Sequence, residues 1–168
     1  TGRPGQATDF SFLRLSAAGE VTRPAIDIKP AHTGTMAWKL IRVLDAEGHA
    51  VGPWAPQVDV ADLRRGLIAM LRTRAFDARM LIAQRQKKIS FYMQALGEEA
   101  IAVAHAQALQ PGDMNFPTYR QQGLLLCRDD IGVIELMCQL LSNDRDPLRG
   151  RQLPVMYSYK RAGFFSIS

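Results

Sequence analysis

The sequence has no apolar run as long as the roughly 18 to 20 residues that a helix needs to cross a bilayer. No stretch within its 168 residues resembles the apolar core of a secretion signal either. Only two cysteines are present, Cys127 and Cys138, and both lie in apolar patterns typical of helices. This placement favours reduced thiols in a core over a disulfide framework. Hydrophobic residues make up 47% of the chain, which excludes disorder throughout.

Residues that carry familiar chemistry are also few. The three histidines, His32, His49 and His105, are far apart, and none stands beside a cysteine or aspartate at metal-ligand spacing. The sequence contains no G-x-S-x-G, P-loop or G-x-G-x-x-G motif. The alanine-rich surroundings of His105 favour a packing or surface role over a catalytic one. Short motifs therefore assign no activity.

The positive charge is concentrated in one segment. The chain carries 21 Lys and Arg against 16 Asp and Glu, a net charge of +5. Residues 64–88 hold eight basic residues and a single acid, Asp77, so the rest of the chain is slightly acidic. Three interpretations of this segment remain open: a solvated helix face, a surface that docks a subunit or a lipoyl domain, and a basic module that contacts nucleic acid. The scarcity of aromatic residues there and the lack of a recognition motif disfavour nucleic acid.

The sequence pattern changes after residue 58. Residues 1–58 hold most of the prolines and little periodicity, which predicts an extended arm with short strands and a small hairpin around the turn at 45–48. The many apolar residues of the arm predict that it packs on another surface. The chain opens on threonine and closes on the apolar run at 164–168, so we interpret it as a fragment of a longer protein.

Helices are predicted for much of the remainder. Apolar residues at helical spacing predict a long helix at 59–86, and an alanine-rich helix follows at 97–109. Thr118 is expected to cap a short helix that extends to Cys127. Asp129 or Asp130 is expected to cap a further helix at 131–141.

Tyr119 and Arg120 would then lie in the first turn of the helix that begins after Thr118. Free backbone N–H groups, the helix dipole, a guanidinium fork and a phenol hydroxyl can converge there on a phosphate. The alternative makes Arg120 a surface ion-pair former and Tyr119 a core residue with a satisfied hydroxyl. The local sequence alone favours this second interpretation.

Several blocks in a fixed order resemble one enzyme family. They are F-P-T-Y-R-Q-Q at 116–122, M-C-Q-L-L-S-N at 137–143 and D-P-L-R-G-R-Q-L-P-V-M-Y at 146–157. Residues 59–168 resemble the α subunit of the thiamine-diphosphate-dependent E1 component of 2-oxo acid dehydrogenase complexes, and these blocks are most similar to its branched-chain members. The arm is similar to that of the bacterial branched-chain proteins at residues 8–15 and 52–54.

The resemblance implies an α/β fold class. Residues 59–168 would be the first part of a thiamine-diphosphate-binding domain, mostly helical over this range and preceded by the arm at 1–58. The implied activity is that of an oxidoreductase that decarboxylates branched-chain 2-oxo acids and passes the acyl group to the lipoyl group of E2. The implied partners are an E1 β subunit, in an α2β2 heterotetramer, and the lipoyl domain of E2, with no membrane partner. The implied location is the cytoplasm in bacteria, or the mitochondrial matrix in a eukaryote.

The resemblance also assigns roles to individual residues. Tyr119 and Arg120 match the pair that contacts the cofactor diphosphate, and Phe91 matches an aromatic residue that lines the pocket for the branched side chain. Ser168 matches a serine that ligates a structural K+ ion. Thr118 departs from the animal relatives, which have Gln there, so the resemblance assigns no polar contact to this position.

Other parts of the family's site would lie beyond Ser168. They are the Gly-Asp-Gly to Asn motif, which holds Mg2+ and with it the diphosphate, and the catalytic histidine of the α subunit. Two phosphates need cationic neutralisation, and one arginine replaces the metal poorly. We therefore expect no catalytic residue among the 168, no decarboxylase activity and no tight cofactor affinity in this chain alone.

Overall fold

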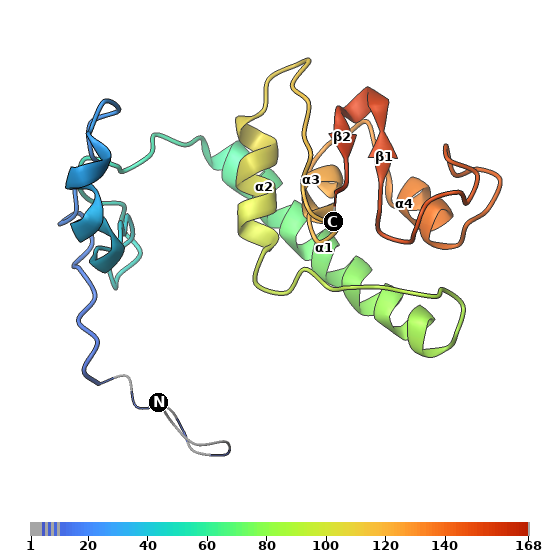
Figure 1. Cartoon of the computed structure of the whole chain (residues 1–168), viewed down its shortest axis with the longest axis horizontal. Coiled ribbons are helices and arrows are strands. Elements are labelled where there is room, and N and C mark those ends of the chain that lie inside the picture. The colour runs from blue at the N-terminus through green and yellow to red at the C-terminus, as the bar shows by residue number, and fades with distance from the viewer. Residues whose placement is uncertain (1–4, 6, 8, 10, 168) are drawn as a thin grey trace. The chain divides into compact units, whose positions relative to one another are not determined.

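Regular structure is distributed unevenly along the chain, and the structure divides after Val58 (Figure 1). The computed structural model describes residues 5, 7, 9 and 11–167. Among the described residues, the first unit, Thr1–Val58, has only short elements, whereas the second, Asp59–Ser168, holds the longer helices and a small sheet. The predicted role of Ser168 lies outside the described residues.

The first unit is built from turns and two 3-10 helices, η1 (Pro30–His32) and η2 (Gly34–Trp38). Where a hairpin is expected, Leu44 and Ala50 form an isolated antiparallel bridge. The Asp45 side chain closes the turn between them, because it accepts hydrogen bonds from the backbone N–H groups of Glu47 and His49. No described residue of this unit is fully buried.

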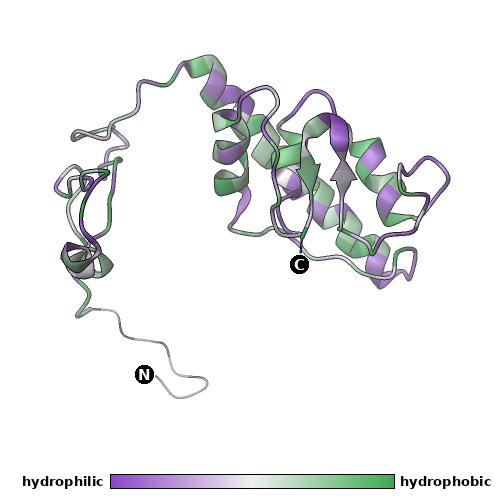
Figure 2. Cartoon of the chain, turned by 45° about the horizontal axis from the view of Figure 1, so that its top comes forward, coloured by the Kyte–Doolittle hydropathy of each residue, from purple (hydrophilic) through white to green (hydrophobic). Residues whose placement is uncertain are grey.

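Two helices lie close to their predicted positions. Helix α1 spans Val60–Arg85, and the Asp59 carboxylate caps it by accepting from the Ala61 N–H. Helix α2 spans Glu99–Ala108 and ends before the turn at 110–113. The two helices pack closely at Gly66, where an added Cβ would lie 3.2 Å from a Val103 methyl group. Figure 2 shows that hydrophobic and hydrophilic residues alternate along the same helices.

The starts of the next two helices differ from prediction. Helix α3 spans Gln122–Leu126 and begins four residues after Thr118, because Thr118 is held in a parallel bridge with Ile167. Helix α4 spans Val133–Leu140, and neither Asp129 nor Asp130 caps it. Gly132 is the cap residue, and its N–H donates to the Glu135 carboxylate at 3.0 Å. Asp130 instead pairs with Arg128 at 3.1 Å.

A two-stranded antiparallel sheet closes the second unit. Strands β1 (Ser158–Tyr159) and β2 (Phe164–Phe165) are joined by the 3-10 helix η3 (Lys160–Ala162) and by Gly163, whose φ of +58° suits glycine. The backbone at Asn115 pairs with Phe164, so the segment before Tyr119 runs alongside β2. This long-range pairing sets the backbone that leads into the candidate site.

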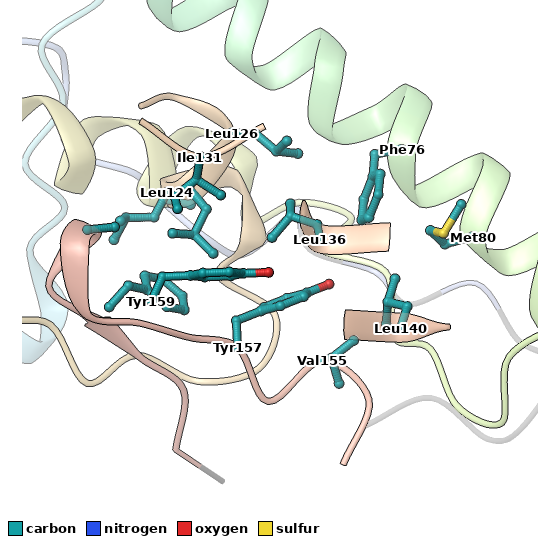
Figure 3. Close-up of a cluster of buried hydrophobic side chains, with 14 of the residues drawn as sticks. Phe76, Met80, Leu124, Leu126, Ile131, Leu136, Leu140, Val155, Tyr157 and Tyr159 are labelled. Carbon is teal, nitrogen blue, oxygen red and sulfur yellow. The ribbon is translucent and has the colours of Figure 1, made fainter. Parts of the chain in front are cut away.

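The core lies between α1, α3, α4 and the hairpin (Figure 3). Its largest fully buried apolar side chains are Tyr157, Phe164, Leu124, Leu125, Leu136 and Leu140. Helices predominate among the regular elements of the described chain, which agrees with the expected helical character. Within the described residues, no helix combines the length and the apolar character that a membrane span requires.

Candidate functional site

A buried carboxylate organises the region around the predicted residues. Asp77 lies on α1 and is fully buried. It accepts hydrogen bonds from the Tyr92 hydroxyl at 2.6 Å, the Ala95 backbone N–H at 2.7 Å and the Gln122 side-chain amide at 2.9 Å. These three donors come from two segments far apart in sequence, so Asp77 ties the segment after Phe91 to the start of α3.

Tyr92 donates to this carboxylate under all ordinary conditions. Burial raises the pKa of the Tyr92 phenol far above its usual value, and the neighbouring Tyr157 and Asp77 raise it further. The hydroxyl therefore keeps its proton and remains a donor to Asp77.

The structure brings Phe91, Tyr119 and Arg120 together. The rings of Phe91 and Tyr119 meet edge to face, with their centroids 6.5 Å apart. The Arg120 guanidinium lies over the Tyr119 ring, 5.3 Å from its centroid. Phe91 is 42% exposed and the Arg120 side chain 39%, so both can reach a ligand.

Tyr119 and Arg120 lie in a turn, not in the first turn of a helix as predicted. The turn forms because Thr118 is held in its bridge to Ile167 and its carbonyl accepts from the Gln121 N–H at 3.2 Å. The expected contribution of a helix dipole at these two residues is therefore wrong. An anion contact here would come from their side chains and from the N–H groups of the turn, without a helix dipole.

Acidic residues at the start of α2 border this cluster. Glu98 pairs with Arg120 across 3.4 Å and accepts a hydrogen bond from the Gln121 side chain at 3.1 Å. The neighbouring Glu99 is buried and forms an ion pair with Arg74 of α1. Burial raises the pKa of the Glu99 carboxyl, but hydrogen bonds from Arg74 and the Gly97 N–H outweigh burial, so its pKa lies below the ordinary value.

Arg120 has unused capacity to bind an anion. Its Nε is buried and lies 3.4 Å from the Glu98 carboxylate, in an ion pair whose geometry does not make a hydrogen bond. A buried N–H that makes no hydrogen bond is unfavourable, and an anionic oxygen in line with it would satisfy it. The cluster therefore fits one side of a diphosphate. The described residues contain no group of three or more His, Cys, Asp or Glu that could hold a metal ion.

The sequence predicts a ligand-binding role for Phe91, Tyr119 and Arg120, but it does not predict the residues that hold them in place. Tyr92 carries no motif of its own, Gln122 belongs to the block at 116–122 without an assigned role, and Asp77 stands out only as the single acid in a basic segment. An acid within an apolar and basic helix pattern was the one available signal, because such a residue is often buried with hydrogen-bond donors.

Comparisons with known proteins bear on both units. The profile of the family described as "Dehydrogenase E1 component" matches residues 68–168, which include the whole cluster. The chain belongs to this dehydrogenase E1 family. A second profile, described as "2-oxoisovalerate dehydrogenase E1 alpha subunit N terminal", matches residues 1–31. The resemblance inferred from the sequence blocks is therefore confirmed.

Similar members of the E1 family come from bacteria, animals and plants. The chain is 66% identical over all 168 residues to the 2-oxoisovalerate dehydrogenase subunit alpha of Pseudomonas aeruginosa. It is 38% identical over 134 residues to the mitochondrial protein of that name from Mus musculus, and 37% identical over 132 residues to subunit alpha 1 of Arabidopsis thaliana. These matches cover 100%, 77% and 76% of this chain, but only 41%, 29% and 27% of the relatives.

Proposed function

We propose that this chain is part of the α subunit of an E1 component that decarboxylates branched-chain 2-oxo acids and transfers the acyl group to a lipoyl group. The observation that carries the proposal is the 66% identity to the Pseudomonas subunit over every residue of the chain. The proximity of Phe91, Tyr119 and Arg120 supports it, because the three residues assigned by the resemblance form one cluster. We place the subunit in an α/β fold of the thiamine-diphosphate-binding class.

Thiamine diphosphate, when bound, would supply the carbanion chemistry that the side chains of this cluster lack. The role of this chain would be to bind and orient the cofactor and the substrate. Arg120 would hold the diphosphate with its guanidinium, and Tyr119 would keep that guanidinium in place by lying beneath it. The Nε of Arg120, which makes no hydrogen bond with a described residue, supports this role.

Phe91 would contact the apolar side chain of the substrate. Its ring is partly exposed and is fixed edge to face on Tyr119, so an apolar group bound there would lie beside the diphosphate residues. Asp77 would hold Phe91 in this position through Tyr92 and Ala95.

The remaining components would come from elsewhere. Mg2+ would be needed to neutralise the diphosphate, and K+ would bind near Ser168, but the described residues provide no such metal cluster. The partners would be an E1 β subunit, in an α2β2 heterotetramer, and the lipoyl domain of E2, in the cytoplasm of a bacterium. The 168-residue chain by itself would be inactive, since Arg120 alone cannot neutralise two phosphates.

A chimera tests the proposal. Residues 1–168 replace the matching segment of the Pseudomonas aeruginosa α subunit, which is co-expressed with its β subunit, and decarboxylation of 3-methyl-2-oxobutanoate is measured. We expect an active chimera, whereas the isolated 168-residue chain shows no activity. In the chimera, Arg120→Ala should raise the dissociation constant for thiamine diphosphate about tenfold or more, as expected for loss of a charged hydrogen bond.

Arg128→Ala serves as the matched control, because Arg128 also pairs with a carboxylate but lies outside the cluster. It should leave the dissociation constant unchanged. A folded chimera without activity would refute the proposed function. An active chimera whose cofactor affinity survives Arg120→Ala would refute only the role of Arg120.

A further inference from the structure

The side of α1 opposite the core is apolar and exposed. The residues that form this outer stripe are Leu67, Leu71, Ala75, Ala78 and Ile82. Each lies two positions, about 200° around the helix, from a buried residue of the same helix. Leu71, for example, is 60% exposed, whereas Thr73 is fully buried. Helix α1 therefore has two apolar sides, and only one of them packs on the core.

The apolar composition of this stripe is not typical of a helix face that only contacts solvent. The outer side of a surface helix is normally polar. Large contiguous apolar patches are rare on the surfaces of monomeric proteins, and they usually mark a contact with another molecule. The two alanines near the middle of the stripe would allow another helix to approach closely.

A cavity lies along one edge of the stripe. It has a volume of about 280 Å3 and is lined by Ala75, Phe76 and Met80 of α1 and by Val133 and Met137 of α4. Its lining is otherwise formed by Arg72 and Arg79, one helical turn to either side of Ala75. An apolar anchor residue flanked by carboxylates would fit such a cavity.

Arginines surround the stripe. All exposed charged residues between positions 64 and 85 are arginine, namely Arg64, Arg65, Arg72, Arg74, Arg79 and Arg85. Arg65 pairs with Asp62 and Arg74 with Glu99. None of the other four has a carboxylate within ion-pair distance in the described part of the chain.

We propose that the outer stripe of α1, with the adjoining cavity, is a docking surface for an acidic amphipathic helix of a partner protein. The leucine, isoleucine or phenylalanine side chains of that helix would cover the stripe, and one of them would enter the cavity beside Ala75. Its flanking Asp and Glu residues would pair with Arg72, Arg79 and the other unpaired arginines. The surface is formed by residues outside the Phe91–Tyr119–Arg120 cluster and does not depend on the proposed activity.

The charges disfavour a second copy of the chain as the occupant. Two α1 helices packed through this stripe would place arginine against arginine in either orientation, because basic residues flank both halves of the stripe. A lipid surface fits less well, since the stripe has leucine and isoleucine but none of the Trp or Phe side chains that also anchor helices in a membrane interface.

Two designed peptides test the proposal with the full 168-residue chain. Both are helical and carry leucine at the a and d positions, and they differ only in having glutamate or lysine at the flanking positions. Binding is followed by fluorescence anisotropy. We expect the glutamate peptide to bind at least about tenfold more tightly than the lysine peptide. Its binding should weaken as added salt screens the ion pairs between glutamate and arginine.

Variants of the stripe locate the binding. Ala75→Glu should weaken binding of the glutamate peptide about tenfold or more, because it places a carboxylate beside the cavity. Ala104→Glu, at an exposed alanine of α2, is the matched control and should leave binding unchanged. The double variant Arg72→Glu/Arg79→Glu should reverse the preference in favour of the lysine peptide, and circular dichroism verifies that each variant is folded.

Several results would overturn the proposal. They are equal affinity for the two peptides, no binding of either, or binding that Ala75→Glu leaves intact. A dimer in sedimentation that Ala75→Glu dissociates would assign the surface to a second copy. Co-sedimentation with phosphatidylserine vesicles that the same variant abolishes would assign it to lipid.

Discussion

The hydroxyl of Tyr92 donates a 2.6 Å hydrogen bond to the buried carboxylate of Asp77. The same carboxylate accepts from the amide of Gln122, two residues after Arg120. One side chain on α1 thereby fixes the spacing between the segment that carries Phe91 and the segment that carries Tyr119 and Arg120. The candidate site depends on a residue that does not face a ligand.

Asp77→Asn should destabilise the second unit. An amide has one acceptor oxygen in place of two and presents an N–H2 group to existing donors, so at least one buried donor loses its partner. We expect a loss of about 1–3 kcal/mol in the free energy of unfolding, measured by urea denaturation. Asp144→Asn, at an exposed aspartate, is the control and should have no effect. Equal stability of the two variants would mean that the three hydrogen bonds are dispensable.

The ion pair between Glu99 and Arg74 should stabilise the fold near neutral pH and lose this effect in acid. The pKa of the Glu99 carboxyl is lower in the folded chain than its ordinary value. The stabilisation is therefore complete above the ordinary glutamate pKa of about 4.3, and it disappears as the pH falls through the folded value. Unfolding by urea should show Glu99→Gln to be less stable than the parent near neutral pH, with a smaller difference in acid. Glu47→Gln, at an exposed glutamate, should follow the parent at every pH. A difference independent of pH would contradict this assignment.

Gly163→Ala should weaken the junction between the hairpin and the segment before Tyr119. An added Cβ would collide with the carbonyl oxygen of Asp113, and the carbonyl of Gly163 accepts from the Asn115 N–H at 2.6 Å. Gly112→Ala is a matched control, because Gly112 also has a positive φ but open space around it. Thermal denaturation should show a larger loss for Gly163→Ala, about 1–3 kcal/mol. Equal losses would show that only the backbone conformation matters.

Phe91→Ala should change substrate preference and leave cofactor affinity intact. Removing the ring leaves space beside Tyr119, which should favour a longer branched side chain by about tenfold in the ratio of kcat/KM values. The measurement uses the chimera with two branched-chain 2-oxo acids that differ by one methylene group. Phe116→Ala is the control, since Phe116 stacks on Phe165 outside the cluster. An unchanged ratio would remove Phe91 from the substrate pocket.

Local sequence predicted the long helices better than the short ones. Helices α1 and α2 follow from apolar spacing and alanine content, which act within a few residues. Thr118 has a suitable side chain for a helix cap, but its backbone is taken by the bridge to Ile167. Spacing within the segment contains no information on a partner so distant in sequence.

The sequence by itself determined the family, and it predicted an arm before residue 59 and ligand-binding roles for Phe91, Tyr119 and Arg120. It could do so because residue order and helical periodicity are local properties. Only the tertiary structure placed these three side chains together, buried Asp77 among its donors, and left the opposite side of α1 apolar and exposed. Burial and orientation depend on which distant segments pack against a residue. The role of the basic segment could therefore be argued only after the structure showed which side of α1 packs on the core and which side is exposed.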